Sequence, residues 1–350
     1  MPLSHETLRP LEVSTVEFDY CHDRPLRTIA TRVVPRDHTA IDVPGRTTCC
    51  LLLGAGISLQ QEAWLPVIKR LYHLTAQPFS RVTIHSVWVI ERPNHGDAGL
   101  LNEAMLKEHY HTTFLSLQYA TAIRAFLASD FLSIHERTNL IAIGHSGAGA
   151  SMIKAIHPAT HNLPISRLML IEPPYVGQSA FAYMEALYKI VEASNARRRT
   201  SWVSVDEAMS YFKKRMPCKI YHPEVWQIMS ETYFREDPQD PERVMTKTTI
   251  EQETASFQDD GTDLKALDYV RSVYHILPTH LILGTREDIW PPEVCKLKHE
   301  NIERDREALA SVSFIQDAGH YIPVQMPVEL AAEIARLLNE FVGGALEARL

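Results

Sequence analysis

The sequence lacks the long apolar runs that a membrane-spanning helix needs, and its first residues, MPLSHETLRPLEVST, contain no apolar core of a secretory signal. Neither internal repeats nor low-complexity segments occur in its 350 residues. Cysteine is scarce: the five cysteines are an odd number and lie scattered along the chain, which argues against a disulfide framework. We therefore expect a protein of a reducing compartment, without a membrane span.

Positive charge is also in deficit, because 43 acidic residues face 35 basic ones and leave a net charge of −8. This balance argues against a nucleic-acid partner, which a basic surface would attract. The hydrophobic share of 45% and the charged share of 22% are typical of a globular protein. The length suits one large α/β domain with an insertion, or two ordinary domains.

Short apolar runs alternate with helical patterns along most of the chain, which predicts an α/β fold with a mostly parallel sheet flanked by helices. Helices are expected over residues 59–74, 112–128 and 328–341, and two antiparallel edge strands in the first fifty residues. The other expected strands cover residues 49–56, 82–90, 139–144, 167–171, 280–284 and 311–315. Residues 174–278 interrupt this pattern and predict a helical cap, or lid, inserted between core segments 1–173 and 279–350.

The stretch IAIGHSGAGA, residues 141–150, carries the first chemical signal. A buried strand that ends in Gly-x-Ser-x-small and leads into a helix is typical of a nucleophile elbow, in which the serine adopts strained backbone angles. Its neighbours must be tiny, and Gly144 meets this need while Ala148 adds one methyl group. The pattern predicts Ser146 as a nucleophile; the alternative is a small-residue turn without chemistry.

The stretch DAGHYIPVQMP, residues 317–327, supplies a partner for the serine. His320 follows the last expected strand, so it should lie at the carboxyl edge of the sheet, where Ser146 also lies. There it could take the proton from Ser146 and return it to the leaving group. Two amide donors for an oxyanion are expected from Gly147 and from the loop at Gly56 and Ile57.

The acid that would orient His320 has several candidates in the sequence. GTREDIWPP, residues 284–292, offers Glu287 and Asp288 after a late strand, whereas LMLIEPP, residues 168–174, places Glu172 at the tip of the strand after Ser146. Each has a structural alternative, since Glu172 could cap the sheet edge and Asp288 the following helix. The residues alone leave Glu172 and Asp288 open.

The chain resembles the α/β-hydrolase superfamily over nearly its whole length. The features that carry this resemblance are the order of serine, acid and histidine along the sequence, the inserted cap and the AGHYIP-type loop. ERPNHGDAGLLNE (91–103) and LGAGISLQQEAWLPVI (53–68) look like its fungal peroxisomal branch, which includes toxin-biosynthesis hydrolases, peroxisomal lipases and the acyl-CoA hydrolase of mycophenolic acid biosynthesis. In that branch the acid can follow the strand after the nucleophile, which favours Glu172. The resemblance also implies a possible homodimer.

The resemblance implies a serine hydrolase that acts through an acyl-enzyme, without a metal or organic cofactor, on a small-molecule acyl-CoA thioester or carboxylic ester. The alternatives are an acyltransferase or cyclising, chain-releasing enzyme on the same fold, and a non-catalytic ligand-binding protein. The ending Ala348-Arg349-Leu350 resembles a peroxisomal address, which predicts a peroxisomal location and an import receptor as a partner.

Two departures from the branch concern the site: the elbow ends in Ala148 instead of glycine, and the oxyanion loop differs. Relatives commonly carry His-Gly in the oxyanion loop, where this sequence has Ala55-Gly56, so the support of a loop histidine is expected to be lost. His95 and Asp97 should line the sheet edge near the site without a catalytic role. Arg197, Arg198 and Arg199 are expected at a solvated helix end, or else in contact with the phosphates of a CoA substrate.

Overall fold

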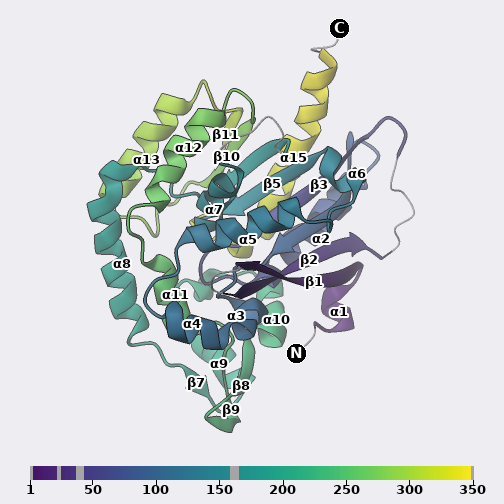
Figure 1. Cartoon of the computed structure of the whole chain (residues 1–350). Helices are drawn as coiled ribbons and strands as arrows, with labels where there is room; N and C mark the ends of the chain where they lie inside the picture. The colour runs from purple at the N-terminus through teal and green to yellow at the C-terminus, as the bar shows by residue number, and fades with distance from the viewer. Residues whose placement is uncertain (1–2, 22–24, 37–42, 158–164, 348–350) are drawn as a thin grey trace.

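An eight-stranded sheet forms the centre of the computed structural model, which describes residues 3–21, 25–36, 43–157 and 165–347 (Figure 1). The strands lie in the order β1-β2-β4-β3-β5-β6-β10-β11. Their bounds are β1 (Leu11–Cys21), β2 (Leu26–Pro35), β3 (Thr47–Gly54), β4 (Val82–Ile90), β5 (Leu140–His145), β6 (Arg167–Ile171), β10 (Thr279–Gly284) and β11 (Ser311–Ile315). The strands predicted from the apolar runs, and the two edge strands, are confirmed with small differences at their ends.

The sheet is antiparallel only at one side, where β1 pairs with β2 and β2 with β4. All other neighbours, from β4 to β11, are parallel. Strands β3, β5 and β6 are covered on both faces, which explains their near-continuous apolar sequence. Because parallel strands end at a common edge, the loops after β3, β5, β6, β10 and β11 meet there.

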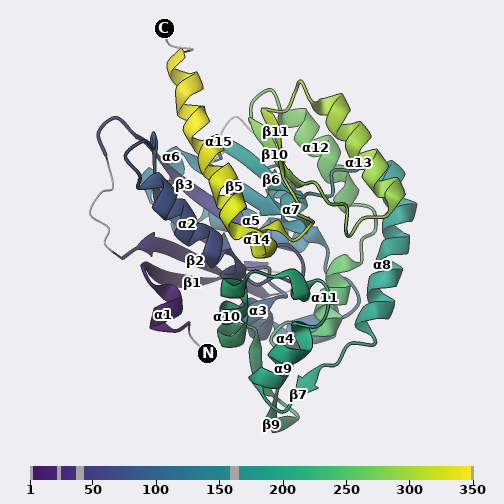
Figure 2. The same cartoon turned by 180° about the vertical axis from the view of Figure 1, so that it is seen from behind.

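Helices cover both faces of the sheet. α2 (Leu65–Thr75) and α15 (Pro327–Glu347) lie in front in Figure 2, whereas α5 (Ser116–Ala128), α7 (Gly147–Ile156) and α12 (Ala266–Val273) lie on the opposite face. The three predicted helices are thus confirmed, the first with a short 3-10 turn, η1 (Gln61–Trp64), before it. Side chains of β3 alternate between the two apolar cores, Leu51 and Leu53 toward α2, Cys50 and Leu52 toward α5.

Residues 174–278, the proposed cap, contain both helices and a small antiparallel sheet of order β7-β9-β8. Their elements are η2 (Gln178–Ala180), α8 (Phe181–Asn195), β7 (Ser201–Trp202), α9 (Val205–Phe212), η3 (Cys218–Ile220), α10 (Pro223–Thr232), β8 (Phe234–Asp237), β9 (Asp240–Thr246), α11 (Ile250–Phe257), η4 (Asp263–Lys265) and α12. The strands were not predicted, because they are short and mostly polar. The last helix, α12, packs on α7 against the main sheet.

Six further helices complete the described part of the chain: α1 (His5–Leu8), α3 (Gly96–Leu101), α4 (Glu103–His109), α6 (Ile134–Thr138), α13 (Pro292–Asp305) and α14 (Ile322–Gln325). Within the residues described, no helix is both long and apolar enough to cross a bilayer.

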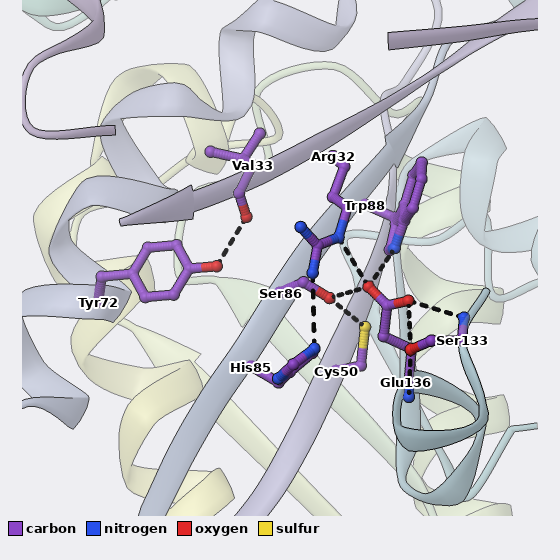
Figure 3. Close-up of polar contacts among 9 residues, drawn as sticks. All are labelled: Arg32, Val33, Cys50, Tyr72, His85, Ser86, Trp88, Ser133 and Glu136. Atoms are coloured by element: carbon purple, nitrogen blue, oxygen red, sulfur yellow. Dashed lines mark hydrogen bonds and ion pairs between the residues drawn. The ribbon is translucent and has the colours of Figure 1, made fainter. Parts of the chain in front are cut away.

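A buried carboxylate ties the short helix α6 to the sheet (Figure 3). Glu136 Oε1 accepts hydrogen bonds from Arg32 Nε at 2.9 Å, Ser86 Oγ at 2.6 Å and Trp88 Nε1 at 2.9 Å. Its Oε2 accepts from the Ser133 amide and hydroxyl, which completes a capping box at the start of the helix. Burial alone would raise the pKa of Glu136, but these hydrogen bonds lower it to about 2.

We expect Glu136→Gln to lower the free energy of unfolding by about 3 kcal/mol at neutral pH, because an amide nitrogen replaces one acceptor among buried donors. A carboxylate with a lowered pKa stabilises the fold above its ordinary pKa and loses that contribution as the pH falls toward 2. Urea unfolding at several pH values should therefore show a difference between the two proteins that shrinks below pH 4.5. A constant difference, or an equal effect of the exposed control Glu303→Gln, would contradict this account.

Candidate active site

Ser146 lies at the turn between β5 and α7, with φ 54° and ψ −128°. This left-handed backbone is strained for a residue with a side chain, and it turns the hydroxyl away from the sheet. The turn is possible because Gly144 has no side chain: a Cβ there would lie 2.7 Å from the Cα of Gly149. Ala148 is tolerated because its methyl group faces Gly54 on β3 instead of the crowded crossing with Gly144.

His320 stands beside this serine, in the loop between β11 and α14. Its Nε2 lies 2.8 Å from Ser146 Oγ, and the imidazole is almost fully buried. The two residues are separated by 174 positions in the sequence, so only the common edge of the parallel sheet brings them together. The predicted pairing of the serine with this histidine is therefore present in the structure.

Glu172 is the carboxylate that faces the other side of the imidazole. It follows β6 directly and has a φ of 46°, and its Oε2 lies 3.5 Å from His320 Nδ1. The Gly284 amide donates to Oε1 at 2.8 Å and fixes the carboxylate plane. The separation of 3.5 Å is that of an ion-pair contact, and such contacts in substrate-free sites commonly shorten when a substrate binds.

Asp288, the alternative acid, binds the backbone of His320 and not its ring. Its Oδ1 accepts a hydrogen bond from the His320 amide at 2.9 Å. A Cβ on Gly319 would lie 1.8 Å from Asp288 Oδ2, so the carboxylate lies against the histidine loop. Glu287 points elsewhere, to His299 at 2.8 Å. In the structure, Asp288 thus binds the backbone of the histidine loop, whereas Glu172 lies next to the imidazole.

His145, the residue before the serine, fixes His320 from behind. Its Nε2 lies 2.9 Å from the His320 carbonyl oxygen, which can only accept, so Nε2 carries the proton. Burial, reinforced by the positive charge of a protonated His320, lowers the pKa of His145 to about 3. A neutral His145 therefore holds the His320 loop without adding charge to the site.

The loop after β3 lies against Ser146, as predicted for oxyanion donors. A Cβ on Gly56 would lie 2.7 Å from His145 Nδ1 and 3.0 Å from Ser146 Cβ, so only glycine allows this approach. Gly147 begins α7, and an amide at this position has no intrahelical acceptor. Ile57 and Gly147 both border the cavity in front of Ser146.

His95 supplies the support that the oxyanion loop was expected to lack. Its Nε2 accepts a hydrogen bond from the Ser58 amide at 3.0 Å, so Nδ1 carries the proton and donates to Asn94 Oδ1 at 2.9 Å. Burial, the larger cause, and the positive charge of Arg92, the smaller one, lower the pKa of His95 well below its usual value. The imidazole of His95 therefore stays neutral. Asp97 instead pairs with Lys247 at 2.7 Å.

Arg92 is a buried residue near Gly147 that no sequence pattern singles out. Its guanidinium is buried over the Tyr119 ring, and its Nε and Nη1 have no hydrogen-bond partner among the residues described. Its Nη2 lies 3.3 Å from the position of a Cβ on Gly147. Burial lowers the pKa of Arg92. A guanidinium charge this close to Gly147 would favour negative charge near that residue.

The cavity in front of Ser146 is narrow and mostly apolar, with a volume of about 60 Å³. Side chains of the proposed cap form much of its wall, chiefly from α8. The apolar and aromatic residues that line it are Ile57, Ala150, Pro174, Met184, Leu187, Tyr188, Val191, Phe257, Leu264, Ile289, Trp290 and Tyr321. Such a wall suits an apolar group next to the serine.

The arginine run of the cap is largely engaged within the protein. Arg198 pairs with Glu253 at 2.7 Å, and Arg199 pairs with Glu207 at 2.8 Å. Arg197 donates to the Ala193 carbonyl at the end of α8. These contacts match a helix end better than a phosphate site. Across the described ranges, no group of three or more His, Cys, Asp or Glu side chains is arranged to hold a metal ion.

Comparison with known proteins places this geometry in a wider context. The family model described as "Alpha/beta hydrolase family" matches residues 50–333. The fold is similar to that of the peroxisomal alpha-beta-hydrolase Lpx1 from Saccharomyces cerevisiae, with a TM-score of 0.74 and 18% identity over 95% of this chain and 90% of that one. It is also similar to a thioesterase domain from the curacin biosynthetic pathway (TM-score 0.57, 17% identity, 94% and 99% covered).

A thermophilic esterase from Thermogutta terrifontis is a third structural relative, with a TM-score of 0.55 and 15% identity over 93% of this chain and 98% of that one. No curated protein matches the sequence. At these identities the structural relatives show the fold alone, and they confirm the predicted fold class: a mostly parallel sheet between layers of helices.

The two acids can be separated with a fluorophosphonate probe, which labels an activated serine. We expect Glu172→Gln to slow labelling of Ser146 by about a thousandfold, because the imidazolium loses its counter-charge and its tautomer control. Asp288→Asn should cost less than about tenfold, since its amide oxygen still accepts from the His320 backbone. Ser146→Ala is the control without labelling. A larger loss in Asp288→Asn than in Glu172→Gln would assign the acid to Asp288.

Proposed function

Because the chain belongs to the alpha/beta hydrolase family, we propose that it is a serine hydrolase that cleaves thioesters or carboxylic esters through an acyl-enzyme on Ser146. The observation that carries this proposal is the contact of 2.8 Å between Ser146 Oγ and His320 Nε2, with Glu172 behind the imidazole. If this position served packing alone, a simpler residue could replace a hydroxyl that is held on a strained turn against a buried imidazole.

In the proposed first half-reaction, His320 Nε2 takes the hydroxyl proton while Ser146 Oγ attacks the carbonyl carbon of the substrate. The negative charge that develops on the carbonyl oxygen is stabilised by the amides of Gly147 and Ile57. His320 then gives the proton to the leaving thiolate or alkoxide, and the C–S or C–O bond breaks. Glu172 stabilises the imidazolium between these two transfers.

The second half-reaction repeats the sequence with water. His320 removes a proton from a water molecule, the hydroxide attacks the acyl carbon, and the proton returns to Ser146 as the acid leaves. No step of this proposed cycle requires a metal or an organic cofactor.

The narrow apolar cavity supports an apolar acyl group beside the serine. A long acyl chain would need α8 to move outward, since its side chains close the wall. Two of the structural relatives, a peroxisomal hydrolase and a thioesterase domain, are consistent with an acyl-CoA thioester and a peroxisomal location. Both stay predictions, as does the homodimer. The import receptor is also a prediction, and the tripeptide that it would bind, Ala348-Arg349-Leu350, lies outside the described residues.

The contacts of the arginine run do not support the predicted CoA-phosphate contact, since Arg198 and Arg199 are paired with carboxylates. An acyltransferase or a cyclising enzyme would use the same acyl-enzyme and differ only in the second nucleophile. No contact of the described site favours an acceptor other than water. A non-catalytic binding protein would not need the serine and the imidazole in contact.

Intact-mass spectrometry tests the proposal with a panel of acyl-CoA thioesters and the matching simple esters. We expect a transient covalent acyl adduct on Ser146 in the wild type, seen after rapid acid quenching and lost as the free acid is released, and almost no adduct in His320→Ala, where the serine lacks the base that removes its proton. Ser146→Ala should show no adduct. Turnover without any dependence on Ser146 would overturn the proposal, and product formation only with an added amine or alcohol would assign the protein to acyl transfer.

A further inference from the structure

Lys298, on α13, is a buried lysine that points at the proposed acid. Its side chain is 9% exposed, and its Nζ lies 2.9 Å from Glu172 Oε2. Burial of a lysine next to a reaction centre is costly unless the charge is paired, and Glu172 supplies that pair. Nothing in the mechanism of a serine hydrolase requires this residue.

The lysine and the imidazole share one oxygen of the carboxylate. Glu172 Oε2 accepts a hydrogen bond from Lys298 Nζ at 2.9 Å and lies 3.5 Å from His320 Nδ1. Its Oε1 accepts a hydrogen bond from the Gly284 amide. The nearer partner of Oε2 is therefore the lysine. The carboxylate is held from β10, from α13 and from the histidine loop, and it cannot turn toward one partner without leaving another.

The balance of charge follows from these contacts. Burial alone would raise the pKa of Glu172, but contact with His320 and the charge of Lys298 lower it to about 2, so the carboxylate stays ionised at any working pH. Its negative charge is then divided between two cationic partners. A carboxylate that is already paired with a lysine stabilises an imidazolium less than a free one does.

Other titratable groups near the pair do not supply a competing charge to Oε2. On α13, burial raises the pKa of the Cys295 thiol to about 11, which keeps it neutral. From the preceding loop, Glu287 pairs with His299 on α13, and Asp288 accepts from the His320 backbone. From β5, His145 is neutral, as its lowered pKa shows.

We propose that Lys298 is a positioning residue, which fixes the Glu172 carboxylate and partly neutralises its charge, so that His320 remains an unprotonated base at lower pH than in a site without the lysine. This inference rests on the proposed function for its consequence in catalysis, whereas the effect that it assigns to Lys298 can be measured in the resting protein. The gain is a wider acidic working range, and the cost is weaker stabilisation of the imidazolium.

The test compares Lys298→Met, which removes the charge at similar volume, with Lys298→Arg, which keeps it. We expect the acidic limb of the pH profile of kcat/KM, measured with a p-nitrophenyl ester, to move upward by about one pH unit in Lys298→Met. Lys298→Arg should return the limb toward the wild-type position. Lys296→Met is the matched control, since this exposed lysine of the same helix pairs with Glu300 and not with Glu172.

A purely structural lysine would lower activity equally at every pH and leave the limb where it is in the wild type. That result, or a limb that moves downward in Lys298→Met, would overturn the proposal. Lys298→Gln separates the two parts of the role, because it keeps a hydrogen-bond donor for Oε2 without charge. We expect the same upward movement of the limb in this variant, with a plateau closer to that of the wild type.

The inference can be tested even if the protein hydrolyses no ester. The pH midpoint of the His320 imidazole signals, followed by NMR in the resting protein, should move upward in both Lys298→Met and Lys298→Gln relative to the wild type. If the midpoint moves but no substrate is turned over, the proposed function fails and the role of Lys298 stands. If turnover occurs but the midpoint does not move, the proposed function stands and the role of Lys298 fails.

Discussion

The contact between Ser146 and His320 depends on a backbone that only very small residues permit. The serine sits at φ 54° because Gly144 lets β5 cross the start of α7, where any side chain would meet Gly149. Gly56 allows the oxyanion loop to approach the same point from β3. These two close approaches bring a hydroxyl, an imidazole and a free helix amide to one place at the edge of the sheet.

The surroundings of the imidazole are as constrained as the serine. His145 binds the His320 carbonyl, Asp288 binds its amide, and Trp290 and Tyr321 meet the ring edge-on. The backbone and the ring plane are thus fixed by groups that take no part in proton transfer. The charged groups in contact on the remaining side are Glu172, 3.5 Å from His320 Nδ1, and Lys298, which pairs with Glu172.

Much of this arrangement could be predicted from the sequence. Short apolar runs identified the strands, and the carboxyl ends of parallel strands placed Ser146 and His320 at one edge. The acid could not be chosen from the residues, because Glu172 and Asp288 both follow strands that end there. The choice depends on which group reaches the ring and which reaches the backbone, and that is decided by side-chain direction.

Lys298, Arg92 and the loop support from His95 were outside the reach of sequence patterns for a related reason. A lysine on a charged helix such as α13 predicts a solvated side chain, and its burial becomes visible only when β6 and α13 are placed together. An arginine after a buried strand is equally ordinary in sequence. The small sheet within residues 174–278 was missed because β7 and β8 have only two and four residues, and because β9, with seven residues, is mostly polar.

The most direct test of the central claim, that Glu172 orients His320, is proton NMR of the protein bound to a boronic acid that mimics the tetrahedral intermediate. The Nδ1 proton of His320 should give a strongly downfield signal, since it lies in a charged hydrogen bond to a buried carboxylate. We expect this signal to persist in Asp288→Asn and to vanish in Glu172→Gln. A signal that survives in Glu172→Gln would contradict the account.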